Sequence, residues 1–418
     1  MGRQLSVRTQ SLSLLLLIAL IGLNLRPFLV APGPLLGSIV NDTGLSYPQA
    51  SMLTLLPMML MGFGAFVVAA RPALIGSHVG LLLALGLMTL GSALRYFVSD
   101  GSTLIITALL CGVGVAFIQS ILPGMIKQFF AQHSAVVTGL YSASLMIGGA
   151  LGAQLMPILL QRGYRWQHAL ALLALPCFAA LVAAWVVLNQ RKQMPEQCDA
   201  LPEVSQAPLS VPQLVSEAIL SPLPLKRLLA RPRTWTLMAA FGIVNGGYAS
   251  LVTWLAPFYQ QRGWDHANSS HLIVVMAVTQ ALFAIGLPAL ARGYTDRRPW
   301  LLLVLVMQAI GFLGFAFYPD IAPHLWSILC GAGLGGAFSL TIVTALEHLP
   351  AVKSAGALTA LMQGGGFLIA AAFPFMFALL LQWSGDFCYG WMMHLLMVIT
   401  TMFICIRFNP KHYDDAMC

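Results

Sequence analysis

Arg26 is a single charge within a long apolar stretch. The run from Ser11 to Val40 has no other charged residue, and Arg26 lies about 14 residues from either end of it. That is roughly 21 Å at the helical rise of about 1.5 Å per residue, which is too far for the side chain to reach water. A charge buried in hydrocarbon is costly and usually faces a polar cavity. Because a guanidinium matches small oxyanions and carboxylates, Arg26 predicts an anion site. A guanidinium that caps carbonyls freed by Pro27 is the structural alternative.

Other polar residues inside apolar segments could line the same cavity. Asn245 opens the motif NGGYASLVTW, in which Tyr248 follows after about one helical turn. Glycines after Asn245 allow close backbone approach, and an aromatic wall could face Arg26. The predicted substrate-binding residues are Arg26, Asn24, Gln119, Tyr141, Asn245, Tyr248 and Gln363. Hydrogen bonding between helices is the alternative role for each amide and hydroxyl.

Charged and titratable residues elsewhere suggest control of a conformational cycle. In ARGYTDRRPW, Asp296, Arg297 and Arg298 could form a charged latch, or could serve membrane orientation only. Glu347 and His394 are candidates for proton transfer. Alternatively, Glu347 is an ordinary carboxylate at the membrane interface, and His394 is a packed polar residue. No Asp or Glu lies at mid-depth in an apolar segment, which favours an anion or a neutral solute over a cation.

The sequence lacks the patterns expected of an enzyme or a metalloprotein. No acid, base and nucleophile converge in any motif, and no phosphate-binding loop is present. The seven cysteines form no CxxC pair and lie mostly in apolar runs, where thiols behave as small hydrophobes. We therefore expect no catalytic residues, no metal and no cofactor.

Composition identifies an integral membrane protein. Of 418 residues, 59% are hydrophobic and 8% are charged, against about 25% charged in soluble domains. The net charge of +8 does not indicate nucleic acid, because the basic residues fall in short loops between apolar runs. The first apolar run is too long for a secretory signal and predicts an uncleaved membrane helix.

Twelve apolar segments are long enough to cross a bilayer, which takes about 20 residues. They are 12–37, 48–70, 78–97, 102–125, 135–160, 168–188, 234–258, 270–291, 299–318, 324–346, 354–381 and 388–407. A proline-rich hydrophilic stretch separates two sets of six. The predicted organisation is therefore a six-helix bundle over 1–188, a cytoplasmic linker over 189–233 and a second six-helix bundle over 234–418.

The distribution of Lys and Arg predicts the orientation. With both termini in the cytoplasm, inner segments carry 16 of these residues and outer loops carry four. The outer four are Arg95, Arg162, Arg165 and Arg262. Because positive charge accumulates on the cytoplasmic side, we expect a multi-pass membrane protein with both termini in the cytoplasm.

The two halves repeat one another. LLCGVGVAF (109–117) matches LCGAGLGGAF (329–338), and TGLYSASLMIGG (138–149) aligns with AGALTALMQGGG (355–366) at an offset of 217 residues. Parallel duplication of six helices predicts an all-α membrane protein of two pseudo-symmetric bundles, which is the layout of the major facilitator fold.

Four motifs resemble those of the cyanate transporter (CynX-type) family of that superfamily. They are LIGLNLRPFLVAPGPLL (20–36), VNGGYASLVTWLAPFY (244–259), GLGGAFSL (333–340) and LMQGGGFLIAA (361–371). The resemblance spans most of both halves and is weakest over 189–233. It matches Arg26 to the family's helix 1 arginine, and Asn245 and Tyr248 to its helix 7 motif. A branch for 2-nitroimidazole efflux shares the arginine but lacks the NGGYAS block.

The resemblance implies a secondary transporter of a small anion, with cyanate as the named candidate, in the lipid bilayer of the bacterial inner membrane. We expect a monomer. Efflux of a neutral or weakly acidic drug-like solute, such as a 2-nitroimidazole, is the alternative. A receptor that binds an anion without moving it is a third possibility. The 45-residue linker (189–233) and the short tail offer such a receptor no output domain.

Overall fold

The computed structural model describes residues 2–70, 78–130, 133–192 and 225–417. All regular structure in these ranges is helical, and it includes twelve helices long and apolar enough to span a membrane. The predicted fold class and the twelve predicted segments are confirmed. Most of the predicted linker, residues 193–224, lies outside the described ranges, so the division at 189–233 stays a prediction.

Within the described ranges, the first half contains nine α-helices, α1 to α9, and two 3-10 turns, η1 and η3. They are α1 (Gly2–Asn24), α2 (Pro27–Val30), η1 (Gly33–Leu35), α3 (Leu36–Thr43), α4 (Tyr47–Ala70), α5 (His78–Leu94), α6 (Gly101–Phe129), α7 (Ser134–Gln161), α8 (Trp166–Ala171) and α9 (Ala174–Lys192). The η3 turn, Arg95–Phe97, extends α5.

The second half contains six long helices and shorter pieces. They are α11 (Leu225–Leu229), α12 (Pro232–Gln261), α13 (His266–Leu290), η5 (Ala291–Gly293), α14 (Arg298–Phe317), α15 (Pro323–Glu347), α16 (Val352–Ser384), α17 (Cys388–Ile406), η6 (Pro410–His412) and α18 (Tyr413–Met417).

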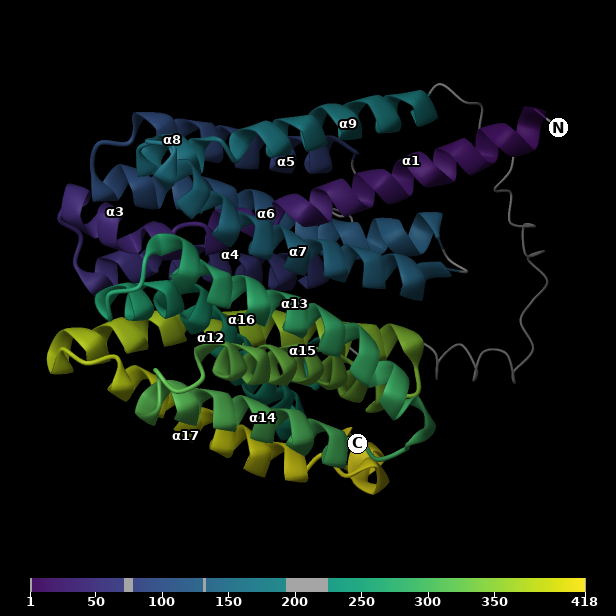
Figure 1. Cartoon of the computed structure of the whole chain (residues 1–418). Helices are drawn as coiled ribbons and strands as arrows, with labels where there is room; N and C mark the ends of the chain where they lie inside the picture. Colours follow the sequence, from purple (N-terminus) through teal and green to yellow (C-terminus); the bar gives the residue numbers. More distant parts are fainter. Residues whose placement is uncertain (1, 71–77, 131–132, 193–224, 418) are drawn as a thin grey trace, which may run out of the picture.

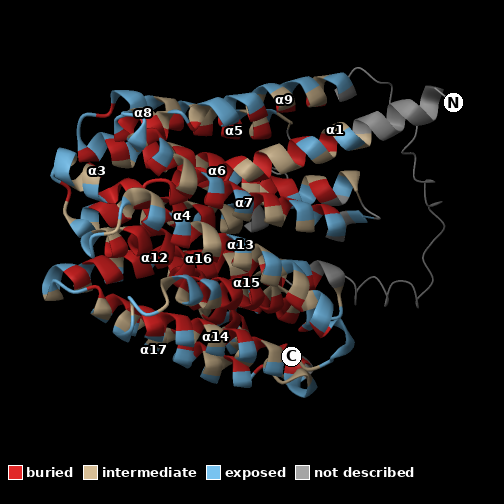
Figure 2. Cartoon of the chain, in the orientation of Figure 1, coloured by how far each residue is buried: buried red, intermediate tan, exposed pale blue. Residues whose placement is uncertain are grey.

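The two halves lie side by side as two helical bundles (Figure 1). α1 begins and α18 ends at the same end of the molecule, which we call the terminal end; the other is the distal end. Burial is greatest along α12, in the middle of the molecule, whereas α9 and α17 show much of their apolar surface to the outside (Figure 2). This is the pattern expected in a lipid bilayer, where a central helix is buried on all sides and outer helices expose apolar faces to lipid.

Proline breaks the first membrane span at its middle. α1 ends at Asn24, and α2 starts at Pro27 with Arg26 as its N-cap residue. Pro27 has no N–H to donate, so the α1 hydrogen-bond ladder cannot continue through it. Pro32 and Pro34 repeat the interruption before α3. The predicted helix over 12–37 is therefore a chain of short pieces that reaches Thr43, and Arg26 sits at its main break.

Candidate functional site

Arg26 and Tyr248 meet at the interface between the two halves. The guanidinium carbon of Arg26 lies 4.8 Å from the centroid of the Tyr248 ring. Both residues are near the midpoints of their spans, Ser11–Thr43 and Pro232–Gln261. A guanidinium over an aromatic face at this distance is a cation–π pair. The ring therefore holds one face of the guanidinium and leaves its edge, which carries the N–H groups, for other partners.

The donors of Arg26 have no partner within the described ranges. The guanidinium makes no hydrogen bond and no ion pair there, and its Nη1 atom is fully buried. The Tyr248 hydroxyl likewise makes no hydrogen bond to a described residue, although the residue is only 6% exposed. Because buried polar groups are nearly always satisfied, this pair has the properties of a binding site for a ligand with acceptor atoms.

Glycines on α7 bring that helix against the break in the first span. A Cβ on Gly148 would lie 2.1 Å from the Leu23 carbonyl oxygen, and one on Gly152 would lie 2.8 Å from the Pro27 Cα atom. Only glycine permits backbones to approach this closely. Consequently α7 forms the third wall beside Arg26, together with the first span and α12.

The two predicted asparagines form hydrogen bonds with residues of their own half. Asn24 donates from Nδ2 to the Leu20 carbonyl at 2.8 Å, and its Oδ1 accepts from the Cys177 thiol at 3.4 Å. Asn245 donates from Nδ2 to the Phe241 carbonyl at 2.8 Å. Neither contact involves Arg26. The structure therefore places Asn24 toward α9 within the first half, and ties Asn245 to its own helix.

The remaining predicted binding residues lie on the terminal-end side of Arg26. Tyr141 is buried, and its backbone carbonyl lies 3.1 Å from the Cβ position of Gly22, about one helical turn before Arg26. Gln119 on α6 and Gln363 on α16 are half-buried and make no hydrogen bond to a described residue. The structure thus brings Arg26 together with Tyr248 and near Tyr141, and shows no direct contact of either glutamine with them.

The halves are joined on the distal side of this pair. The Pro34 carbonyl accepts a hydrogen bond from Gln260 Nε2 at 3.0 Å and lies 3.1 Å from His266 Nδ1. The hydroxyls of Thr54 and Thr253 are hydrogen-bonded at 2.9 Å. These bonds link the first span and α4 to α12 and α13. The site is therefore closed off toward the distal end by direct contact between the halves.

Two ion pairs occupy the terminal end of the second half. Arg297 pairs with Glu347 at 2.7 Å, and Arg298 pairs with Asp296 at 2.7 Å. The side-chain hydrogen bond from Arg298 holds the pKa of Asp296 below its usual value. Its carboxylate therefore stays charged as the pH falls through the ordinary aspartate range, and the pair is lost only below it. Arg297 ties the loop before α14 to the end of α15.

His394 lies among aromatic rings inside the second half. Its ring centroid is 5.0 Å from that of Phe312, 5.5 Å from that of Phe373 and 6.1 Å from that of Phe377. Its Nε2 atom is buried and has no partner among the described residues. This is the environment of a packed histidine, away from the Arg26–Tyr248 pair in sequence and in contacts.

Arg95 is a buried charge that the sequence analysis placed in an outer loop. It is fully buried, its Nε donates to Thr107 Oγ1 at 3.4 Å, and neither Nη atom has a partner within the described ranges. The buried residues Met88 and Ser92 precede it at helical spacing, so a buried stripe runs into Arg95 and could have signalled its position. Three outer basic residues remain, and the predicted asymmetry is unchanged in direction.

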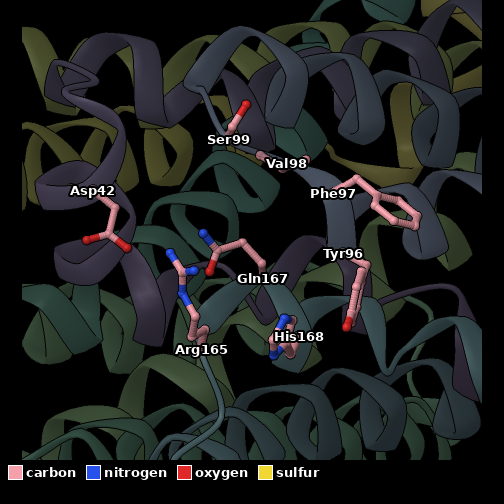
Figure 3. Close-up of a pocket in the computed structure, with 8 residues that line it drawn as sticks. All are labelled: Asp42, Tyr96, Phe97, Val98, Ser99, Arg165, Gln167 and His168. Atoms are coloured by element: carbon pink, nitrogen blue, oxygen red, sulfur yellow. The ribbon is translucent and has the colours of Figure 1, made fainter.

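A separate pocket of about 450 Å³ opens at the distal end of the first half (Figure 3). It is lined by Asp42, Tyr96, Phe97, Val98, Ser99, Arg165, Gln167 and His168. Figure 3 shows Asp42, Arg165 and Gln167 on one side and the aromatic rings of Tyr96 and Phe97 on the other. Asp42 accepts a hydrogen bond from the Trp166 indole at 2.8 Å. None of the predicted binding residues lines this pocket, and its mixed charges do not match a simple anion.

Comparison with known proteins agrees with this architecture. Residues 12–374 match the model of the Major Facilitator Superfamily. The cyanate transport protein CynX of Escherichia coli K12 is 38% identical over 96% of this chain and 98% of its own length. A 2-nitroimidazole transporter of the same strain is 27% identical over 85% of each chain. The crystal structure of a D-xylose–proton symporter superposes with a TM-score of 0.69 at 16% identity, covering 96% of this chain and 98% of that one.

These similarities extend over both halves, and they agree with the twelve spans and the paired bundles. The chain is a membrane transporter rather than an enzyme. It belongs to the major facilitator superfamily and, within it, to the cyanate transporter family typified by CynX.

Proposed function

We propose that this protein carries a small monoanion, with cyanate as the first candidate, across the bacterial inner membrane by alternating access. The observation that carries the proposal is the Arg26 guanidinium, which is stacked on Tyr248 at mid-depth and makes no hydrogen bond to any residue that the structure describes. The 38% identity to a cyanate transport protein supports the choice of anion. The terminal end, with both termini, is the cytoplasmic side.

In this mechanism the anion binds at the edge of the guanidinium. Tyr248 fixes the plane of Arg26, so the N–H groups point in one direction and accept a ligand with little reorganisation. Rocking of the halves about this point then exposes the site to one side of the membrane at a time. Because Arg26 and Tyr248 come from the two halves of one chain, a monomer is sufficient.

We propose two roles for the other predicted binding residues, which are Asn24, Asn245, Gln119, Tyr141 and Gln363. Tyr141 and the two glutamines are proposed to line the path between the site and the terminal end. The asparagines are proposed to support the helices through the hydrogen bonds that they already make. Proton coupling is proposed only through Glu347, which is exposed, or through His394.

Counterflow in proteoliposomes tests the function. Vesicles loaded with unlabelled cyanate are expected to take up labelled external cyanate faster than vesicles without protein. Unlabelled 2-nitroimidazole added outside is expected to leave this uptake unchanged. Competition by the nitroimidazole without cyanate exchange would support the efflux alternative, and absence of exchange with every solute would reject the carrier.

Glu347→Gln tests the predicted latch at Asp296, Arg297 and Arg298, because it removes the carboxylate charge that pairs with Arg297. Loss of a partly exposed ion pair typically costs about 0.2–1 kcal/mol, so we expect little change in thermal stability. A shift of that size in the conformational equilibrium changes the cyanate exchange rate by up to about fivefold. The measurement is the counterflow rate beside the melting temperature.

Asp320→Asn is the matched control, because it removes the charge of the carboxylate that pairs with Arg262 at the distal end of the same half. This variant is expected to exchange cyanate at the original rate. Equal effects of the two variants on that rate would argue against a latch at the terminal end.

A further inference from the structure

Gly149 leaves a small space beside Arg26 and Tyr248. A Cβ atom built on Gly149 would lie 3.5 Å from Arg26 Cβ, 3.5 Å from Val30 Cγ2 and 3.6 Å from the Tyr248 hydroxyl oxygen. These are ordinary van der Waals distances, so one methyl group fits there without displacing any neighbour. The three walls of the site meet at this point.

Helix packing does not explain the glycine at this position. Gly148 and Gly152 on the same helix face the backbone of the first span and leave no room for a side chain. Gly149 meets no such barrier, and glycine inside a helix is less stable than alanine. Packing does not require this glycine, and it lies next to a guanidinium that makes no hydrogen bond within the described part of the chain, which suggests that the space itself is used.

The Tyr248 hydroxyl points to a ligand in this space. The side chain is more than nine-tenths buried, and its oxygen makes no hydrogen bond to a described residue. The hydroxyl oxygen itself keeps some accessible surface, so a solute held beside it can reach it. An acceptor atom of a ligand held at the edge of Arg26 would satisfy it.

We infer that the space at Gly149 receives the transported anion and sets the upper limit of its size. This inference rests on the proposed function. A linear monoanion such as cyanate fits between the guanidinium edge and the Tyr248 hydroxyl. A planar, branched anion such as nitrate needs more of the space on the Gly149 side. Gly149 is therefore a specificity-determining residue, with Val30 as the opposite wall.

Gly149→Ala tests the inference in the full-length protein in proteoliposomes. Labelled cyanate counterflow is measured against unlabelled cyanate and against unlabelled nitrate as competitors. One added methyl group in a fitted pocket discriminates by about tenfold or more. We expect competition by nitrate to weaken at least about tenfold more than competition by cyanate. Val30→Ala enlarges the same space from the other side and is expected to strengthen nitrate competition relative to cyanate.

Gly139→Ala is the matched control, because it adds the same methyl group to the same helix where nothing lies within 4 Å. It is expected to leave both competitions unchanged. Equal changes for cyanate and nitrate in both Gly149→Ala and Val30→Ala would overturn the inference. Failure of the proposed function itself would look different, since the unmodified protein would then show no cyanate counterflow.

Discussion

Arg26→Ala is expected to abolish cyanate counterflow while the protein still inserts and folds. The guanidinium makes no hydrogen bond or ion pair with a described residue, so its removal breaks no such contact within the described fold. Removing one partner of a buried charged contact costs about 2–5 kcal/mol, and every 1.4 kcal/mol is about tenfold in affinity. Cyanate affinity should therefore fall roughly thirtyfold or more. Binding to the purified protein and counterflow measure it.

Arg26→Lys separates charge from geometry. Lysine keeps the positive charge but loses the planar fork that stacks on Tyr248, so we expect partial loss of cyanate affinity, smaller than with alanine. Arg162→Ala is the control, because it removes an exposed arginine whose side chain makes no hydrogen bond or ion pair with a described residue. If both Arg26 variants bound cyanate as tightly as the unmodified protein, the site would have to be sought elsewhere.

The twelve spans were predictable because each apolar segment is long enough to cross a bilayer and short polar segments separate them. The interruption of the first span at Arg26 was harder to predict from the sequence. Pro27 indicates a bend, but the three further pieces up to Thr43 depend on Pro32 and Pro34 together. Such a run of prolines stays in the membrane only because α7 and α12 pack around it, which is a tertiary fact.

The candidate site was predictable by residue type but not by contact. Arg26 is conspicuous as a charge in an apolar run, and Tyr248 belongs to a polar aromatic motif, yet their stacking depends on how the two halves dock. Gly148 and Gly149 are adjacent glycines that the sequence does not distinguish. In the structure Gly148 faces the backbone of the first span, whereas Gly149 faces the space beside Arg26 and Tyr248. Arg95 was misplaced because a charge at a helix end normally faces water.

Gly33→Ala is expected to weaken the closure between the halves at the distal end. A Cβ on Gly33 would lie 2.1 Å from the Val252 carbonyl oxygen on α12. The added Cβ is attached directly to the Gly33 backbone, and the carbonyl oxygen belongs to the Val252 backbone. Rotation of a side chain therefore cannot relieve the clash, and the halves must separate there. Overpacking of this kind costs about 1–3 kcal/mol, which shifts the equilibrium between closed and open conformers by roughly fivefold to more than a hundredfold.

Labelling of Thr253→Cys with a membrane-impermeant maleimide from the distal side measures this shift, because Thr253 is buried in the contact between the halves. Labelling is expected to rise with Gly33→Ala. It should stay low with Gly37→Ala, whose added Cβ would meet only the Gln260 side chain at 3.9 Å. Retained cyanate binding by the Gly33→Ala protein shows that it is folded. If such a folded protein labelled no faster than the Gly37→Ala control, the Gly33–Val252 approach would not govern access to the site. The distal closure would then have to depend on the hydrogen bonds at the Pro34 carbonyl, since Thr253→Cys removes the hydroxyl that bonds Thr54 in both proteins.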